Sequence, residues 1–338
     1  MIASKSQCMI TGVYRSGTEY VAQLLSGHPA LSSTMYHVNA YRFIRGRYEP
    51  LCSVENARRA VADTADRLKA RYDISLDQQQ ALERFRLAPH KNCEAIYDAI
   101  VSALWIRGNR IHWAEKCQLV WREIPDFIAG MSNGRAILVI RDPRSTLASF
   151  KEYTYAPPPA YLGAVFNCFD AFKSALHYQS ILPVDRYLTV RYEDVVRAPR
   201  LWLENLLAFL NLDIGEAFLD RSSWKNERGD DWQDNTAFAS EFKIDDAIHR
   251  WQGRLSDAEI ALTEMVCGDA MTALGYTLSG KSVAWPQVEA MWKEDRHVME
   301  YVRLWREMGQ GIEAFPTDPL DPSNWQESRT GAGVRRAG

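Results

Sequence analysis

The chain has 338 residues, of which 46% are hydrophobic and 25% are charged, and its formal net charge is -3. This length is enough for one large α/β domain or two small ones with a full core, and the composition is that of an ordinary soluble protein. A net charge this small excludes a general nucleic-acid binder, so any basic site must be local.

The first predicted element is a short apolar strand that leads through a tight turn into a helix. Gly12 and Gly17 let the backbone of this turn bend and approach a ligand. Ser16 and Thr18 add hydroxyl donors next to the free N–H groups at the start of the helix. Arg15 supplies a permanent, forked positive charge. The turn is therefore predicted to hold an anion.

A second short strand is predicted at 30–35, and three helices separate it from the third strand at 110–116. The three helices are expected at 54–72, 77–87 and 95–106. Insertions of this kind in an open α/β sheet commonly cover the ligand crevice. We therefore expect the insertion, about 47–108, to cover the acceptor site and select the substrate.

Strands and helices alternate through the following part of the chain. The predicted elements are a helix at 120–130, a strand at 135–140, a helix opened by Asp142 and Pro143, a long helix at 161–181, a strand at 185–190 and a helix at 199–210. The strand at 135–140 has five apolar residues in a row, as in a parallel sheet covered on both faces. This alternation predicts an α/β fold with a central parallel sheet of about five strands flanked by helices.

The last third of the chain is predicted to be mainly helical. A polar stretch at 222–241 indicates a long loop that can fold over a ligand. Helices are expected at 245–254 and 257–274, followed by a last helix whose apolar stripe runs over 288–305. We expect a main domain at 1–280, a C-terminal helix packed on it at 281–315 and a flexible tail at 316–338.

The turn after the first strand departs from the ATP- and GTP-binding pattern. A Walker A loop needs a Lys before its Ser or Thr, whereas here Thr18 directly follows Gly17. The sequence Tyr-Arg-Ser-Gly-Thr at 14–18, followed by a helix that ends in His28-Pro29, instead resembles the 5′-phosphosulfate loop of sulfotransferases that use 3′-phosphoadenylyl sulfate (PAPS). With Arg in the loop, it is closer to the bacterial and Golgi types than to the cytosolic type. The resemblance implies a P-loop NTPase-like sulfotransferase fold with helical insertions.

A second anion site is predicted where the strongest strand ends. Arg141 follows this strand, and Ser149 lies eight residues further along, a helical rise of roughly 10 Å that an arginine side chain can span. Ligands of open parallel sheets gather at such strand ends. Arg141 and Ser149 at this spacing resemble the 3′-phosphate site of the family, and two anion sites imply a doubly phosphorylated nucleotide.

Two later segments extend the resemblance. Tyr192, after the fifth strand, resembles a family tyrosine that contacts the nucleotide, and Arg250 matches a C-terminal pattern of bacterial sulfotransferases that caps the 3′-phosphate. Trp232, in the polar loop, resembles part of a family lid loop. The nucleotide-binding residues implied are Arg15, Ser16, Gly17, Thr18, Glu19, Arg141, Ser149, Tyr192 and Arg250.

Sulfuryl transfer needs positive charge at the transferred group and the leaving phosphate, and a base for the attacking hydroxyl. By resemblance, Arg15 meets the leaving phosphate and Lys116, at the end of the third strand, bridges the sulfonate. This assignment requires no metal ion. Neither Cys/His spacing nor a C-x-x-C pair in the sequence indicates a metal site.

The general base is less well marked than the nucleotide site. Bacterial and Golgi relatives place a Glu shortly after the second strand, and cytosolic relatives use a His after the third. The first window here holds His37 and no carboxylate, and the second holds Gln118. His37 is the only residue in either window with a suitable unperturbed pKa, so it is the predicted base, with Glu115 and His112 as alternatives.

The sequence thus predicts a PAPS-dependent sulfotransferase that moves a sulfuryl group to a hydroxyl, or as second choice an amine, of a small-molecule or glycan acceptor, and that releases PAP. One alternative is a P-loop kinase or other nucleotide hydrolase, which Mg²⁺-dependent ATP turnover would reveal. The other is a nucleotide-binding protein of the same fold without transfer activity.

The expected setting is the cytoplasm. Six cysteines without paired spacing favour a reduced compartment. The N-terminus enters a strand without an apolar leader, and no run of eighteen apolar residues occurs. We therefore expect a bacterial-type enzyme without a membrane anchor or a nucleic-acid partner, whose oligomeric state the sequence leaves open.

Overall fold

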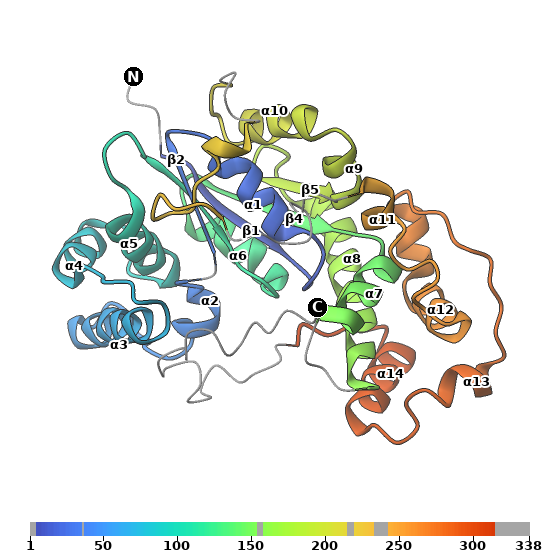
Figure 1. The fold of residues 1–338 in the computed structure, drawn as a ribbon. Helices are drawn as coiled ribbons and strands as arrows, with labels where there is room; N and C mark the ends of the chain where they lie inside the picture. Colours follow the sequence, from blue (N-terminus) through green and yellow to red (C-terminus); the bar gives the residue numbers. More distant parts are fainter. Residues whose placement is uncertain (1–4, 36, 154–157, 215–219, 233–242, 315–338) are drawn as a thin grey trace.

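The computed structural model describes residues 5–35, 37–153, 158–214, 220–232 and 243–314. Its centre is a five-stranded parallel sheet in the order β2-β3-β1-β4-β5 (Figure 1). The strands are β1 Gln7–Gly12, β2 Leu31–Met35, β3 His112–Lys116, β4 Gly134–Ile140 and β5 Tyr187–Arg191. The predicted α/β class and strand number are confirmed.

Both faces of the sheet are covered, as the apolar run of β4 predicts. Ile137 and Val139 belong to one buried cluster, whereas Leu138 and Ile140 belong to another, because successive strand residues point to opposite faces. Helices α1 Thr18–Ser26, α9 Tyr192–Arg197 and α10 Pro199–Phe209 complete the first cluster. Helices α5 Cys93–Trp105, α6 Ile124–Gly130, α8 Gly163–Ile181 and α12 Asp257–Ala273 contribute to the second.

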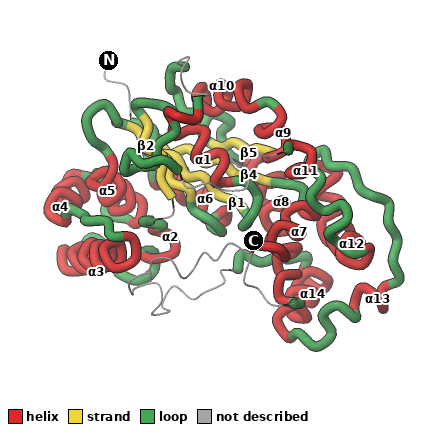
Figure 2. Tube along the Cα trace, in the orientation of Figure 1, coloured by secondary structure: helices red, strands yellow, loops and turns green. Residues whose placement is uncertain are grey.

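The insertion between β2 and β3 forms a helical lobe beside the β2 edge of the sheet (Figures 1 and 2). It contains α2 Ala40–Phe43, α3 Val54–Tyr72, α4 Gln78–Leu87 and α5. Ser53, Asp77 and Asn92 cap α3, α4 and α5 through side-chain oxygens that accept a backbone N–H three residues on. These caps explain why the three predicted helices start close to their expected positions.

The C-terminal part differs from the sequence prediction in two places. The single helix expected over 288–305 is two helices, α13 Trp285–Glu289 and α14 Arg296–Met308, because Asp295 caps a new start by accepting the N–H groups of His297 and Val298. The helix expected at 245–254 is only α11 Ile244–Ile248; the backbone of His249, with φ of -100° and ψ of 25°, is no longer helical.

Helix α14 packs against α8, and the segment after it is held there by a backbone hydrogen bond from the N–H of Ile312 to the carbonyl oxygen of Phe166. The proposed tail at 316–338 lies outside the described residues. No helix in the described parts of the chain is long and apolar enough to cross a membrane.

Candidate functional site

The predicted site residues follow the ends of five neighbouring strands. In spatial order across the sheet, His37 lies beyond β2, Lys116 ends β3, the loop with Arg15 follows β1, Arg141 follows β4 and Tyr192 follows β5. Since all five strands are parallel, these groups share one edge of the sheet. Neighbouring strands are about 4.8 Å apart, so the ends of β3 and β4 are separated by roughly 10 Å, enough for an extended ligand.

The loop after β1 has a strained backbone that leaves no room for added atoms. Arg15 and Gly17 both have positive φ, +70° and +94°. The ring of Tyr192 fills the space beside Gly17, where a Cβ would meet the ring 2.1 Å away. Gly12 is equally confined, since a Cβ there would lie 2.4 Å from the carbonyl oxygen of Val139. Glycine at both positions is therefore required by the packing as well as by the turn.

Two arginines tie this loop to the end of β4. The Nε atom of Arg15 donates a hydrogen bond to Oγ of Ser149 at 3.0 Å, in helix α7 Pro143–Tyr153. Arg141 donates from Nη1 to the carbonyl oxygen of Arg15 at 2.9 Å and from Nη2 to that of Ala247. Its guanidinium also lies 4.7 Å from the centre of the Tyr192 ring. The two predicted anion sites thus form one continuous corner.

Two buried donor atoms in this corner have hydrogen-bonding capacity that the described residues do not use. Among the described residues, Oγ of Ser16 and Nε of Arg141 are buried without a hydrogen-bond partner. Buried donors are rarely left unpaired in a folded protein unless a ligand or water completes them. Both atoms can donate a hydrogen bond, and burial lowers the pKa of the Arg141 guanidinium. An anion fits this site, because it would supply acceptors and restore the preference for the charged form.

The start of the α1 helix contributes the rest of the cradle. Thr18 is its first residue and is buried, and Glu19 stands in its first turn. Glu19 is near enough to Lys116 for its charge to raise the lysine pKa, against a larger opposite effect of burial. The predicted residues of the first loop are therefore all at the same helix start, with Lys116 beside them.

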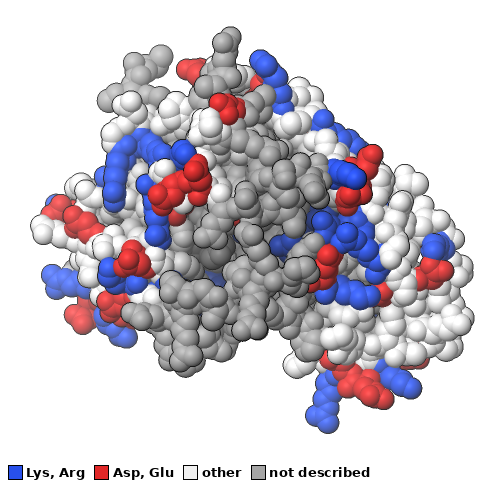
Figure 3. Space-filling view, in the orientation of Figure 1, with Lys and Arg blue, Asp and Glu red and all other residues white. Residues whose placement is uncertain are grey.

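Arg250 lies on the outer side of the corner. Its charge acts on both Arg141 and Tyr192, and its Nη1 donates to Glu152 at 3.2 Å. The preceding segment is held on α7, because Oγ of Ser145 donates to the carbonyl oxygen of Ile248 at 2.7 Å. Figure 3 shows Lys and Arg side chains gathered on the same side of this face as α7 and α11.

A buried carboxylate fixes the ends of β4 and β5 relative to each other. Glu193, the residue after Tyr192, accepts the backbone N–H of Asp142 at 2.8 Å and the hydroxyl of Tyr276 at 3.0 Å. Burial raises the pKa of Glu193, and the backbone N–H groups of Asp142 and of Glu193 itself, together with the charge of Arg141, oppose that effect in part. Glu193 thereby holds Arg141 and Tyr192 in register across two strands.

Lys116 has only 2% of its surface exposed. Burial lowers its pKa to about 8; the charges of Glu19 and Cys117 act in the opposite direction, and Arg15 lowers it further. Lys116 therefore remains mainly protonated at neutral pH but is close to losing its charge. Such a lysine is suited to stabilise negative charge that develops during a reaction.

His37 is buried beside β2. Its backbone carbonyl accepts from Arg67, and its ring packs edge-on against Tyr72 at 4.8 Å between centres. Burial, together with the positive charges of Arg228, Arg67 and Lys116, lowers the pKa of His37 to about 3. The imidazole is therefore neutral at physiological pH and accepts a proton poorly. Its assignment as general base stays a prediction.

The two alternative bases lie in different surroundings. Glu115 is fully buried and accepts the N–H groups of Val38 and Asn39 and the hydroxyl of Tyr97, so its oxygens are committed to holding the turn after β2. His112 begins β3, at the end remote from Lys116, and its Nδ1 accepts the N–H of Ser6 at 2.9 Å. Neither geometry favours a base.

Sequence reasoning missed one buried acid next to His37. Oε1 of Glu227 lies 3.5 Å from Nδ1 of His37, and the side chain of Glu227 is 4% exposed. Glu227 belongs to the polar loop expected to fold over a ligand, but nothing in the sequence distinguishes it from the neighbouring Asp230 and Asp231. The spatial pairing was not visible because the two residues are far apart in the chain.

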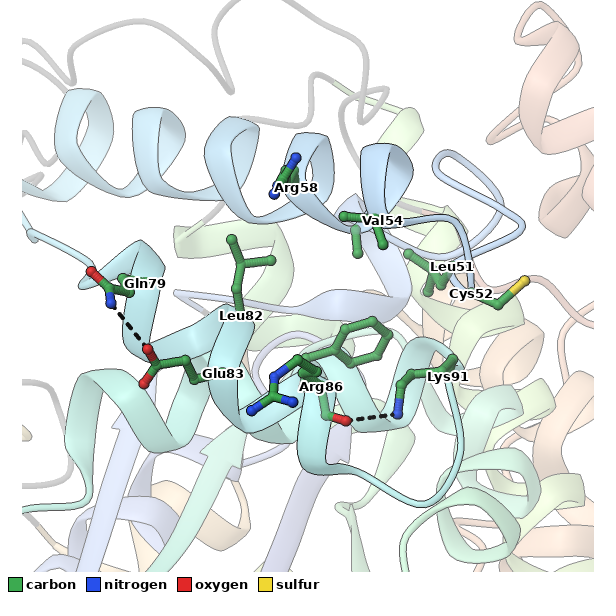
Figure 4. A pocket seen from close by; sticks show the side chains of 11 residues that line it. Leu51, Cys52, Val54, Arg58, Gln79, Leu82, Glu83, Arg86 and Lys91 are labelled. Carbon is green, nitrogen blue, oxygen red and sulfur yellow. Dashed lines mark hydrogen bonds between the residues drawn. The ribbon is translucent and has the colours of Figure 1, made fainter.

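A pocket of about 430 Å³ opens between α3 and α4 in the insertion (Figure 4). Its lining includes the apolar residues Val54, Leu82 and Phe85 and the charged residues Arg58 and Glu83. None of the predicted site residues lines it. Among the described residues, no group of three His, Cys, Asp or Glu side chains is placed to hold a metal ion.

Comparison with known proteins identifies the family. The model described as "Sulfotransferase family" matches residues 8–216. Carbohydrate sulfotransferase 7 from Rattus norvegicus is 36% identical over 96 residues, which are 28% of this chain and 20% of that protein. Carbohydrate sulfotransferase 1 from the same species is 25% identical over 164 residues, 44% of this chain and 40% of that protein. The matches therefore span a fifth to two fifths of these relatives.

The fold is shared with a solved sulfotransferase domain. The domain from the olefin synthase of Synechococcus PCC 7002 superimposes with a TM-score of 0.54 and 22% identity, covering 82% of this chain and 98% of that domain. The predicted sulfotransferase fold is confirmed.

Proposed function

The chain belongs to the sulfotransferase family, and from that premise we propose that it transfers a sulfuryl group from PAPS to an acceptor hydroxyl. The observation that carries the proposal is the corner formed by Arg15, Ser149 and Arg141, where Oγ of Ser16 and Nε of Arg141 are buried without a hydrogen-bond partner among the described residues. This corner offers separate sets of donors at the ends of β1 and β4, as a nucleotide with phosphates at both its 5′ and 3′ positions requires.

Each group in the corner has a role that follows from its position. Arg15, Ser16, Gly17 and Thr18 would hold the 5′-phosphate at the helix start, and Arg141 and Ser149 would hold the 3′-phosphate. Tyr192 covers the loop at Gly17 and packs against Arg141, and Arg250 adds charge from outside. PAPS, when bound, supplies the activated sulfuryl group.

Lys116 is placed to stabilise the group in transfer. It ends β3 beside the loop of β1, since Ile10 pairs with Lys116 in the sheet. A buried cation at this position neutralises charge that develops on the sulfuryl oxygens and on the leaving phosphate. Its strength depends on low solvent exposure, which the packing around β3 provides.

We propose a saccharide hydroxyl as the acceptor, with an amine as second choice. The support is the similarity to proteins named carbohydrate sulfotransferases, which covers part of each chain. The insertion with α3, α4 and α5 lies beside the β2 edge, next to His37, and is the expected cover of the acceptor (Figure 1).

The proposal is tested by binding and transfer measured separately. Calorimetry with PAP should show tight binding without a metal ion, and ³⁵S-labelled PAPS should transfer label to members of a panel of mono- and disaccharides, phenols and amines. PAP binding with no labelled product would favour the non-catalytic binding protein. Mg²⁺-dependent ATP hydrolysis, without PAP binding, would favour the kinase or hydrolase and contradict the proposal.

We also keep the cytoplasm and a bacterial-type enzyme as proposals. All six cysteines fall within the described residues and are unpaired, five of them buried, which fits a reducing compartment. Fractionation of the native host, with thiol labelling of the intact cells, tests this location.

A further inference from the structure

The polar loop brings a buried carboxyl group to the end of β2. The side chain of Glu227 is 4% exposed, and its Oε1 lies 3.5 Å from Nδ1 of His37. Its second oxygen, Oε2, is buried with no hydrogen-bond partner among the described residues. A buried carboxyl oxygen without a partner is costly, so its retention needs an explanation such as catalysis or a bound ligand.

Contacts on three sides hold this part of the loop in place. Nη1 of Arg110 donates to the carbonyl oxygen of Glu227 at 3.4 Å, and Nη2 of Arg228 donates to that of Tyr72, at the end of α3, at 2.5 Å. Nε1 of Trp232 donates to Oγ of Ser26 in α1 at 2.8 Å. Glu227 is thereby fixed between the insertion and α1, the two elements that border the end of β2.

The other member of the pair is equally fixed. The turn after His37 is held by Glu115, which accepts the N–H groups of Val38 and Asn39, and by Arg67, which donates to the carbonyl oxygens of His37 and Val38. Glu115 directly precedes Lys116 in β3. The charge of Lys116 acts on His37, so the His37 and Glu227 pair stands near the cation proposed to meet the sulfuryl group.

The surroundings of the pair shift the pKa values of His37 and Glu227 in opposite directions. The charged and titratable groups that act on it from the loop, the insertion and β3 are Arg228, Asp230, Arg67, Glu115 and Lys116. Burial and then positive charges lower the pKa of His37, whereas burial raises the pKa of Glu227 to about 7, with Arg228 opposing and Glu115 adding to the effect. A base works best with a pKa near the working pH.

We propose that Glu227 is the general base of the transfer and that His37 is its positioning residue. This inference rests on the proposed function. Neutral His37 donates from Nδ1 to Oε1 of Glu227, a contact that shortens when the site is filled, and Oε2 faces the acceptor. The loop thus supplies the carboxylate that is missing after β2.

In the proposed step, each bond that forms is matched by a bond that breaks. Oε2 takes the proton of the acceptor hydroxyl while the acceptor oxygen forms a bond to sulfur. The bond between sulfur and the 5′-phosphate oxygen breaks, and its electron pair stays on the phosphate of PAP, where Lys116 and Arg15 stabilise it. The protonated Glu227 then releases its proton to water.

The experiment uses Glu227→Gln, which keeps size and polarity but cannot accept the proton, and Glu204→Gln as control. Glu204 lies on α10, is 38% exposed and pairs with Arg200. Single-turnover conversion of PAPS to PAP, in the presence of the saccharide panel, counts transfer to any acceptor including water. We expect Glu227→Gln to slow the conversion of PAPS to PAP about a hundredfold or more and to change the PAP dissociation constant less than twofold. We expect Glu204→Gln to behave like the wild type in both measurements.

Two further measurements report the titration of the Glu227 carboxyl group itself and not only the size of the rate change. The infrared difference between wild type and Glu227→Gln should show a carboxyl band that titrates near pH 7. The rising limb of the pH profile should follow the same value, and His37→Asn should shift this limb while lowering the rate less than Glu227→Gln does.

The outcomes distinguish this inference from the function on which it rests. Wild-type turnover with Glu227→Gln within threefold of it, or a larger loss in His37→Asn than in Glu227→Gln, overturns the assignment of Glu227 and leaves the sulfotransferase intact. A wild-type chain that neither binds PAP nor converts PAPS overturns the proposed function itself. A wild type that binds PAP but converts no PAPS contradicts both.

Discussion

Arg15 and Ser149 are 134 positions apart in the chain, and their side chains are joined by a hydrogen bond of 3.0 Å from Nε to Oγ. The bond connects the loop after β1 to helix α7 after β4. A side chain assigned to the proposed 5′-phosphate position is therefore hydrogen-bonded directly to one assigned to the 3′-phosphate position. A change at one position should therefore be felt at the other.

Replacement of Ser149 with Ala tests this connection. The variant loses a donor to the 3′-phosphate, and a hydrogen bond to a charged group contributes about 1.5–3 kcal/mol. We expect PAP affinity to fall about tenfold to a hundredfold, measured by calorimetry. Affinity for AMP, which has no 3′-phosphate, should fall less, because Ser149→Ala affects the 5′-phosphate position only through the lost hydrogen bond to Arg15.

The matched control for this variant is Ser180→Ala. Ser180 is exposed on α8 and bonds only locally, to the carbonyl oxygen of His177. An equal loss of PAP affinity in both variants, or an equal loss of PAP and AMP affinity in Ser149→Ala, would contradict the assignment of Ser149 to the 3′-phosphate.

Two glycines with nearly the same φ allow the effect of packing on stability to be measured apart from the effect of backbone strain. Gly17 has φ of +94° and meets the Tyr192 ring, whereas Gly229 has φ of +92° and nothing within 4 Å of a Cβ. Ala at either position costs about 1–2 kcal/mol of backbone strain. We expect Gly17→Ala to lower the free energy of unfolding by about 1–3 kcal/mol more than Gly229→Ala, owing to overpacking. Urea titration of both variants provides the measurement; equal values would show that the ring yields.

Arg250 and Arg254 form another matched pair, because both donate to Glu152. Arg250 is 12% exposed and acts on Arg141, whereas Arg254 is 45% exposed. A buried cation facing the phosphate matters more than an exposed one. We expect Arg250→Ala to weaken PAP binding about tenfold or more and Arg254→Ala less than twofold. Similar losses in the two variants would mean that Arg250 does not reach the nucleotide.

The pH profile should fall on the alkaline side because of Lys116. Its pKa is lowered to about 8, so the ammonium is present below pH 8 and is lost as the pH rises through that value. We expect kcat/KM for PAPS to decline above pH 8. In Lys116→Arg the charge persists, so the decline should move up by more than one pH unit, although the maximum is lower. An unmoved decline would assign it to another group.

The sequence alone placed the residues of the proposed nucleotide corner at the ends of strands, for a physical reason. Arg15 and Arg141 are placed by local patterns, because Arg141 directly follows a strand, and Arg15 follows one within three residues, and the apolar run of each strand identifies it. Parallel strands then bring their ends to one edge, which follows from topology alone. The same reasoning placed Lys116 correctly at the end of β3.

The catalytic half was not open to the same reasoning. Glu227 follows no strand and belongs to a loop whose position depends on contacts with Tyr72 and Ser26, formed only in the folded chain. The properties of His37 also depend on distant residues, because Arg67 and Arg228 lower its pKa. Spacing in the sequence carries no information about such contacts. The short helix α9 was not predicted from the sequence; it begins at Tyr192, directly after the last residue of β5.

Arg141 donates hydrogen bonds to two backbone carbonyl oxygens, those of Arg15 and Ala247. Its long side chain thus loses its rotational entropy when the protein folds, and a nucleotide meets a cation that already has a single orientation. Association then requires no search among side-chain conformers. A free sulfate ion, too short to span the proposed 5′ and 3′ phosphate positions of the corner, gains little from this rigidity, so the shape of the site favours the nucleotide over the abundant small anions of a cell.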